Sequence, residues 1–116
     1  MTALGIDPVI TETGTVLRLS GELDLATIAD AEDALARTES EGRGGITLDL
    51  RYLAFIDSTG LRFILSAHVR AVEQDRPFAI VRAPDVVHRV FVLTGLDERL
   101  PFSDAADSLP GASGPP

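Results

Sequence analysis

Two patterns of apolar residues meet in the middle of the chain, between residues 46 and 73. Every second residue from 46 to 50 is apolar, which is typical of a strand with one buried face. Apolar residues then recur every three or four positions from 61 to 72, which is the spacing of a helix that buries one side. This stretch therefore predicts a strand that runs through a short loop, residues 55–60, into a helix.

The chain before this stretch predicts an antiparallel hairpin and a first helix. Residues 3–10 form a weak strand, and Pro8 restricts it to the edge of a sheet because proline cannot donate a backbone hydrogen bond. A turn at Glu12–Gly14 leads into a second strand at residues 16–20. Residues 26–39 then carry an apolar stripe opposite charged residues, which indicates an amphipathic helix.

The chain after this stretch predicts one more strand and one more helix. Asp75–Pro77 ends the central helix, since proline cannot continue it. Residues 78–81 are apolar on both faces, as expected for a strand in a covered sheet. A short helix begins at Pro84, and Gly95 suits the left-handed position that closes it. Residues 100–102 add either a last edge strand or a brief helix.

Strands that alternate with helices through short links are typical of an α/β fold. We predict a mostly parallel sheet, opened by the antiparallel N-terminal hairpin, with helices from the β-α-β crossovers. Residues 1–102 form this domain, and the small, polar and proline-rich residues 103–116 form a flexible tail. Because the carboxyl ends of parallel strands share one edge of a sheet, we expect Asp24 and the Asp57–Ser58 loop to lie at the same edge.

The composition excludes several functions. With no cysteine, the chain of 116 residues has no disulfide framework and no thiol chemistry. Its net charge of −8 and the even spread of its ten basic residues argue against binding nucleic acid or an anionic membrane directly. All ten are arginines, so the lysine of a phosphate-binding loop, a Schiff-base enzyme or a receiver domain is missing. Without a bilayer-length apolar run or a secretion signal, we expect a cytoplasmic protein.

Candidate catalytic and metal-binding residues are few. His68 and His88 lie on different predicted helices and match no metal-ligand spacing, so we expect helix-surface or core-edge residues and no metal or other cofactor. Ser58 lacks the GxSxG turn of a serine hydrolase, and nothing in the sequence places a histidine beside it. We therefore expect no enzymatic activity. Asp57 or Ser58 can cap the following helix, and capping is the simplest role for Ser58.

Four blocks of sequence resemble one known family. They read MTALGID at the start, LRLSGELDLATI in the second strand and beyond, LDLRYLAFIDSTGLRFIL in the centre and PDVVHRVFVLTGLDERLPF near the end. In this order and spacing, the chain resembles the bacterial anti-sigma factor antagonists of the STAS (sulphate transporter and anti-sigma antagonist) fold, in particular the sporulation anti-anti-sigma factor. The blocks cover most of residues 1–102, and the segment from Asp57 to Leu61 is the most specific piece.

The resemblance implies a regulatory binding protein. In the family, the serine at the position of Ser58 is phosphorylated by a partner that is both an anti-sigma factor and a serine kinase. The unphosphorylated protein binds this kinase and frees its sigma factor, phosphorylation ends the binding, and a phosphatase acts on the phosphoserine. The GELD segment that ends at Asp24 lines part of the partner-binding surface in relatives. The resemblance thus implies these partner-binding residues: Asp24, Asp57, Ser58, Thr59, Gly60, Leu61 and Arg62.

Arg62 departs from the family, in which glycine is common at this position. If the helix begins at the loop, Arg62 lies four residues after Ser58 on the same face, and its guanidinium group either binds a phosphate on Ser58 or points into water. A different function also fits the sequence. As an unphosphorylated STAS scaffold or small-ligand sensor, the protein would use Ser58 only as a helix cap.

Overall fold

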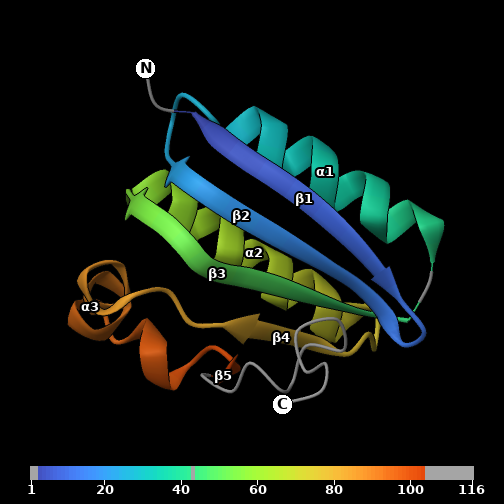
Figure 1. Ribbon diagram of the computed structural model, residues 1–116. Helices are drawn as coiled ribbons and strands as arrows, with labels where there is room; N and C mark the ends of the chain where they lie inside the picture. The colour runs from blue at the N-terminus through green and yellow to red at the C-terminus, as the bar shows by residue number, and fades with distance from the viewer. Residues whose placement is uncertain (1–2, 43, 104–116) are drawn as a thin grey trace, which may run out of the picture.

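The computed structural model describes residues 3–42 and 44–103. Figure 1 shows one sheet with helices packed against it. The tail predicted at residues 103–116 lies outside the described residues except for Ser103, which belongs to the last strand. The elements in chain order are β1 (Leu4–Thr11), β2 (Gly14–Leu23), α1 (Ile28–Glu41), β3 (Gly45–Ile56), α2 (Ser58–Glu73), β4 (Phe78–Val81), α3 (Asp85–Leu93), η1 (Leu96–Glu98) and β5 (Phe102–Ser103).

The five strands lie side by side in chain order, β1-β2-β3-β4-β5. β1 is antiparallel to β2, and every later pair of neighbours is parallel. The predicted fold class is therefore confirmed, with the N-terminal hairpin at one edge of the sheet. Pro8 lies on β1, where only one side of the strand pairs with a neighbour, as a proline requires.

β2 and β3 extend further than the alternation of apolar residues predicted. The two strands stay paired as far as Leu23 and Ile56, but their register shifts between Arg18 and Ser20 and again between Gly21 and Glu22. A register shift breaks the period of two along the sequence while the backbone pairing continues. Residues 55 and 56, predicted as the start of the loop, therefore belong to the end of β3.

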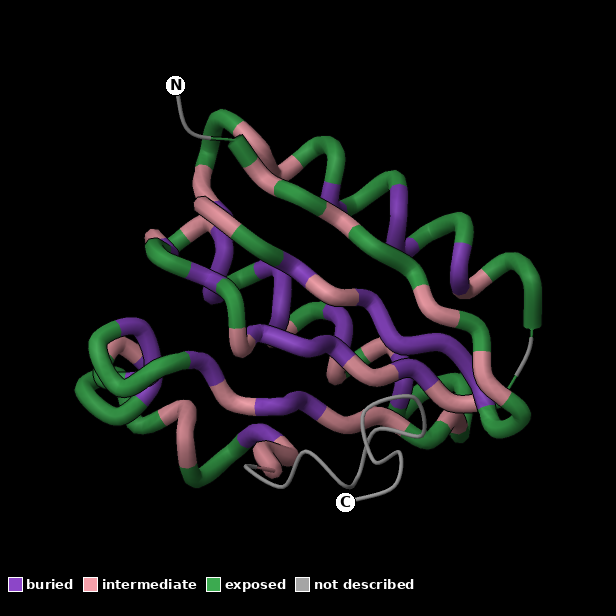
Figure 2. The backbone as a smooth tube through the Cα atoms, viewed as in Figure 1, coloured by how far each residue is buried: buried purple, intermediate pink, exposed green. Residues whose placement is uncertain are grey.

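The hydrophobic core lies between one face of the sheet and the two long helices. α1 and α2 both pack on the same side of the sheet, behind the strands in the view of Figure 1. Figure 2 shows the buried positions concentrated on β2, on β3 and on the helix sides that face them. Apolar residues that the alternating pattern placed inside β3 are almost fully buried, including Leu48 and Leu50. The stripe predicted on the central helix is partly wrong, since Val69 and Val72 are 46% and 65% exposed. Packing against the sheet buries another side of α2 with the same helical spacing, residues 64, 67 and 71.

Several helix ends agree with the sequence and some differ. Gly95 has a positive φ of 77° directly after α3 and its cap residue, as predicted. α1 begins at Ile28, two residues later than predicted, because a turn occupies residues 25–27. Of the two alternatives for residues 100–102, the edge strand is correct, since Phe102 pairs with β4. The 3-10 helix η1 was not predicted.

One charged cluster lies on the sheet face away from the helices. Asp49 falls between two core leucines on β3, so strand alternation turns its side chain to the opposite face. The Asp49 carboxylate is fully buried and receives two hydrogen bonds of 3.0 Å from the Arg51 guanidinium, with the Nε of Arg18 at 3.5 Å. A buried charge needs such partners, so these arginines are committed to the fold.

Candidate functional site

The loops that follow β2 and β3 meet at the carboxyl edge of the sheet. The Leu25 N–H donates a hydrogen bond of 3.1 Å to Oδ2 of Asp57, across 32 positions of sequence. The Asp57 N–H in turn donates to the Leu23 carbonyl oxygen at 3.3 Å. The expectation that Asp24 and the Asp57–Ser58 loop share one edge is therefore confirmed, and a single residue, Asp57, ties the two loops together.

Asp57 is also the N-cap of α2. Its backbone is extended, with φ −113° and ψ −173°, and its Oδ1 accepts a hydrogen bond of 3.0 Å from the Gly60 N–H. Ser58 is the first residue of the helix itself. The interpretation of Ser58 as the cap is therefore wrong, because a cap needs the extended backbone that Asp57 has and an N–H three residues ahead.

The Ser58 side chain is consequently available at the surface. The residue is exposed, and none of the hydrogen bonds found within residues 3–42 and 44–103 uses its hydroxyl group. The site therefore presents a small neutral nucleophile on a rigid helix start.

The charge of Asp57 is stabilised where it lies. The hydrogen bond from the Gly60 N–H is the largest cause that lowers the pKa of this carboxyl below its ordinary value of 3.8, and the Leu25 N–H adds to it. Partial burial opposes the shift but does not reverse it. Asp57 is thus a fixed negative charge directly before Ser58 at neutral pH.

Asp24 stabilises the neighbouring loop. Its Oδ1 accepts hydrogen bonds from the N–H groups of Ala26 at 3.0 Å and Thr27 at 3.2 Å, which fixes the turn before α1. Asp24 is half-buried, and the N-cap position of α1 is Thr27. Its contact with a partner stays a prediction.

Gly60 and Leu61, two of the predicted partner-binding residues, lie inside the protein. A Cβ atom on Gly60 would lie only 2.6 Å from the carbonyl oxygen of Leu23, so glycine lets α2 approach the end of β2. Leu61 is 9% exposed and belongs to the core. The structure therefore assigns these two residues to the support of the surface, whereas Ser58 and Arg62 are exposed and Thr59 is half-buried.

Two apolar side chains beside the loops escaped the sequence analysis. Leu25, whose N–H binds Asp57, is 75% exposed, and Phe55 at the end of β3 is 47% exposed. Exposed apolar residues grouped around a polar centre are common at protein interfaces. The signal was present in the sequence, since Leu25 follows the strand without belonging to either apolar stripe.

Arg62 lies beside a groove between α1 and α2. The groove has a volume of about 470 Å³ and is lined by Ile28 and Glu32 of α1 and by Thr59, Arg62 and Ser66 of α2, among others. At its far end, Arg70 pairs with Glu39 at 3.0 Å. Arg62 makes no ion pair with any described residue. Because α2 begins at Ser58, the condition for Ser58 and Arg62 to share one face is met.

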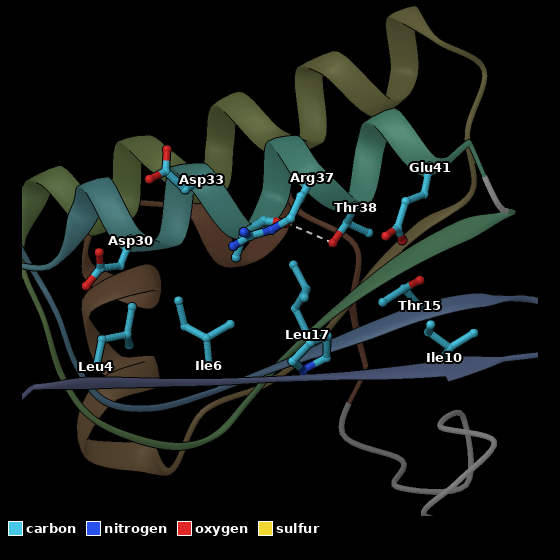
Figure 3. Close-up of a pocket in the computed structure, with 12 residues that line it drawn as sticks. Leu4, Ile6, Ile10, Thr15, Leu17, Asp30, Asp33, Arg37, Thr38 and Glu41 are labelled. Carbon is cyan, nitrogen blue, oxygen red and sulfur yellow. Dashed lines mark hydrogen bonds between the residues drawn. The ribbon is translucent and has the colours of Figure 1, made fainter.

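A second cavity lies between β1 and α1, as Figure 3 shows. Its volume of about 460 Å³ falls within the usual range for small-molecule sites. Leu4, Ile6 and Ile10 line its floor, while Asp30 and Asp33 lie on the helix above. The cavity thus combines an apolar floor with a charged wall, to which Arg37 also belongs.

Both histidines serve as packing residues. His88 is buried against Phe91 and Phe102, and this burial is the main cause that lowers its pKa below the ordinary value of 6.5. His68 is half-buried with its ring 5.7 Å from that of Phe78. Within the described part of the chain, no group of three or more potential ligands could hold a metal ion. No helix described by the structure has the length and apolar character needed to cross a membrane.

Comparison with known proteins gives consistent matches. The family model described as "Mlab, STAS domain" matches residues 6–102. The anti-sigma-F factor antagonist RsfB of Mycobacterium tuberculosis is 36% identical over 101 residues, which cover 85% of this chain and 81% of that protein.

Three similar solved structures share the fold. An anti-sigma factor antagonist from Mycobacterium paratuberculosis has a TM-score of 0.81 at 23% identity and covers 95% of this chain and 91% of its own. The anti-sigma factor antagonist SpoIIAA in its unphosphorylated form has a TM-score of 0.71 at 21% identity, covering 94% and 97%. SpoIIAA of Bacillus in its phosphorylated form has a TM-score of 0.65 at 20% identity, covering 87% and 91%. From the family model and from RsfB, the chain belongs to the STAS-domain family of anti-sigma factor antagonists.

Proposed function

We propose that the protein is an anti-sigma factor antagonist that is switched by phosphorylation of Ser58. In its unphosphorylated form it binds an anti-sigma factor that is also a serine kinase, and this binding frees the sigma factor. The observation that carries the proposal is the exposed Ser58 hydroxyl at the start of α2, uncommitted to any hydrogen bond among the described residues. Two relatives support the proposal: RsfB is named as an anti-sigma-F factor antagonist, and SpoIIAA has a solved structure in its phosphorylated form.

The binding surface is the carboxyl edge around Ser58. Leu25 and Phe55 supply exposed apolar area, while Asp24 and Asp57 supply carboxylates whose positions are fixed by hydrogen bonds. Rigid side chains lose little conformational freedom when a partner covers them, which favours binding. A neutral Ser58 fits at the centre of such a surface without a desolvation penalty for a charge.

Phosphorylation reverses this fit. The kinase transfers the γ-phosphoryl group of ATP to the Ser58 oxygen, the hydroxyl proton leaves to a base of the kinase, and ADP departs. The new group carries a charge of about −1.5 to −2. An unpaired charge in a packed interface costs about 2–5 kcal/mol, which lowers affinity about thirty-fold or more. Asp57, one residue away, adds to the repulsion of any acidic partner group. A phosphatase hydrolyses the ester and restores binding.

The direct test is the mass of the intact protein after incubation with candidate kinases of the source genome and ATP. One added phosphate is expected, and it should disappear in Ser58→Ala. Ser66→Ala is the matched control, because Ser66 is another exposed serine on α2, and it should still gain the phosphate. Phosphorylation that persists in Ser58→Ala would assign the modification elsewhere and contradict the proposal.

Calorimetry with a confirmed partner tests the charge switch itself. Ser58→Ala should bind about as well as the unmodified protein and resist release by ATP, whereas Ser58→Asp should bind poorly. Since Asp57 rather than Ser58 caps α2, neither change removes the cap. Equal affinities of the two variants would overturn the charge-switch mechanism.

The cavity between β1 and α1 favours a second candidate function, that of a small-ligand sensor or scaffold that is not phosphorylated. Its size and its apolar floor suit a small molecule. The two functions differ in the mass experiment, because the sensor gains no phosphate. Thermal shift with a ligand library, compared between the protein and Ile6→Asp in the cavity floor, would identify this function.

A further inference from the structure

We infer that Arg62 binds the phosphate group once Ser58 is phosphorylated and holds it against the first turn of α2. The inference rests on the proposed function, since it concerns the state of Ser58 that the kinase produces. It adds a second part to the switch: the modification adds negative charge and also withdraws a positive charge from the partner-binding surface.

The geometry of α2 brings the two side chains together. The helix begins at Ser58, so Arg62 is four residues further along the same face. Side chains on a helix lean toward its N-terminus, which directs the long arginine side chain back over the turn that contains Ser58 and Thr59. Both Ser58 and Arg62 are exposed, so the pair can form without a change of the fold.

Arg62 is available for this role, whereas some of the other arginines already have acidic partners. Arg51 is held by the buried Asp49, and Arg70 is held by Glu39 at 3.0 Å. Glu32 of α1 lines the same groove as Arg62, yet the two make no ion pair. A phosphate dianion brings more charge than Glu32 and three acceptor oxygens, which suit the forked donors of a guanidinium group.

Asp57 carries the main charge that opposes the binding of a phosphate between Ser58 and Arg62. Its two carboxylate oxygens are turned toward the N–H groups of Gly60 and Leu25, which hold it in the loop. Asp57 makes no ion pair with Arg62, although its charge still repels the phosphate. The free N–H dipoles of the helix start partly offset that repulsion.

The test uses protein with phosphoserine installed at position 58 by genetic code expansion, so it does not depend on any kinase. A ³¹P NMR titration at low salt measures the second pKa of the phosphate, which is ordinarily about 6. In the wild-type sequence this pKa should lie about 0.5 unit lower than in Arg62→Gln, because a bound guanidinium favours the dianion. The difference should shrink as salt is added.

Two further variants sharpen the result. Arg62→Lys keeps the charge without the fork and should lower the pKa by a smaller amount. Arg89→Gln is the matched control, since it removes another exposed arginine, on α3, and it should leave the pKa unchanged. The same pKa in wild type and Arg62→Gln at low salt would overturn the inference. Failure of kinases to modify Ser58 would instead count against the proposed function alone.

Discussion

Replacing Gly60 by alanine tests how the functional loop is held against the end of β2. Alanine at this position places a Cβ atom 2.6 Å from the Leu23 carbonyl oxygen and 2.7 Å from Cγ1 of Ile56. Gly60 has no positive φ, so its backbone conformation suits alanine and the conflict is one of space alone. The Leu23 carbonyl group and the start of α2 must therefore move apart.

The magnitude combines three effects. Overpacking of this kind costs about 1–3 kcal/mol. Displacement of the Leu23 carbonyl also weakens the hydrogen bond that it accepts from the Asp57 N–H, at about 0.5–1.5 kcal/mol. Alanine is better than glycine inside a helix by about 1 kcal/mol, which offsets part of the loss. We expect a net loss of about 1–3 kcal/mol in the free energy of unfolding.

Urea unfolding followed by far-ultraviolet circular dichroism measures this loss. The midpoint should fall while the slope stays the same, because the surface exposed on unfolding is unchanged. Ser66→Ala on the exposed face of α2 is the control and should change stability by less than about 0.5 kcal/mol. A Gly60→Ala protein as stable as the wild type would refute the close approach of α2 to β2.

Two other contacts predict measurable effects. Asp57→Asn should cost about 1–3 kcal/mol of stability in urea unfolding, because the amide NH2 group replaces one of the two acceptor oxygens. Either the Leu25 N–H or the Gly60 N–H then loses its acceptor. An unchanged midpoint would contradict the role of Asp57 in joining the two loops. Burial lowers the pKa of His88, so the unfolded chain takes up the proton first as the pH falls below 6.5, and stability should fall with pH in that window. His88→Leu should remove this part of the pH dependence between about pH 7 and pH 5. If stability fell with pH at the same slope in both proteins, the contribution of His88 would be refuted.

Local patterns determined most of the secondary structure. The periods of two and of three to four residues predicted the first part of β3 and the helices α1, α2 and α3, because burial of one face acts on each element separately, and a continuous apolar run predicted β4. The order of elements then implied a mostly parallel sheet with an N-terminal hairpin, and hence one shared carboxyl edge. The motif around Ser58 could therefore be placed at that edge before any coordinate was known.

Other features depend on contacts between distant segments. The choice between Asp57 and Ser58 as the cap of α2 follows from the extended backbone of Asp57 directly after β3, which no local pattern specifies. The hydrogen bond from Leu25 to Asp57 joins residues 32 positions apart, and no local pattern encodes it. The pairing of β2 and β3 likewise continues where the alternation of apolar residues ends.

The functional surface likewise combines features that the sequence predicts with features that depend on the tertiary structure. From sequence alone, Ser58 and its neighbours formed a single motif in which every residue was a candidate for contact with a partner. Packing of α2 against β2 separated them, since it buried Gly60 and Leu61 and left Ser58 and Arg62 in solvent. Sequence determines which residues are adjacent along the chain, whereas exposure depends on which elements cover them, and only the assembled sheet and helices decide that.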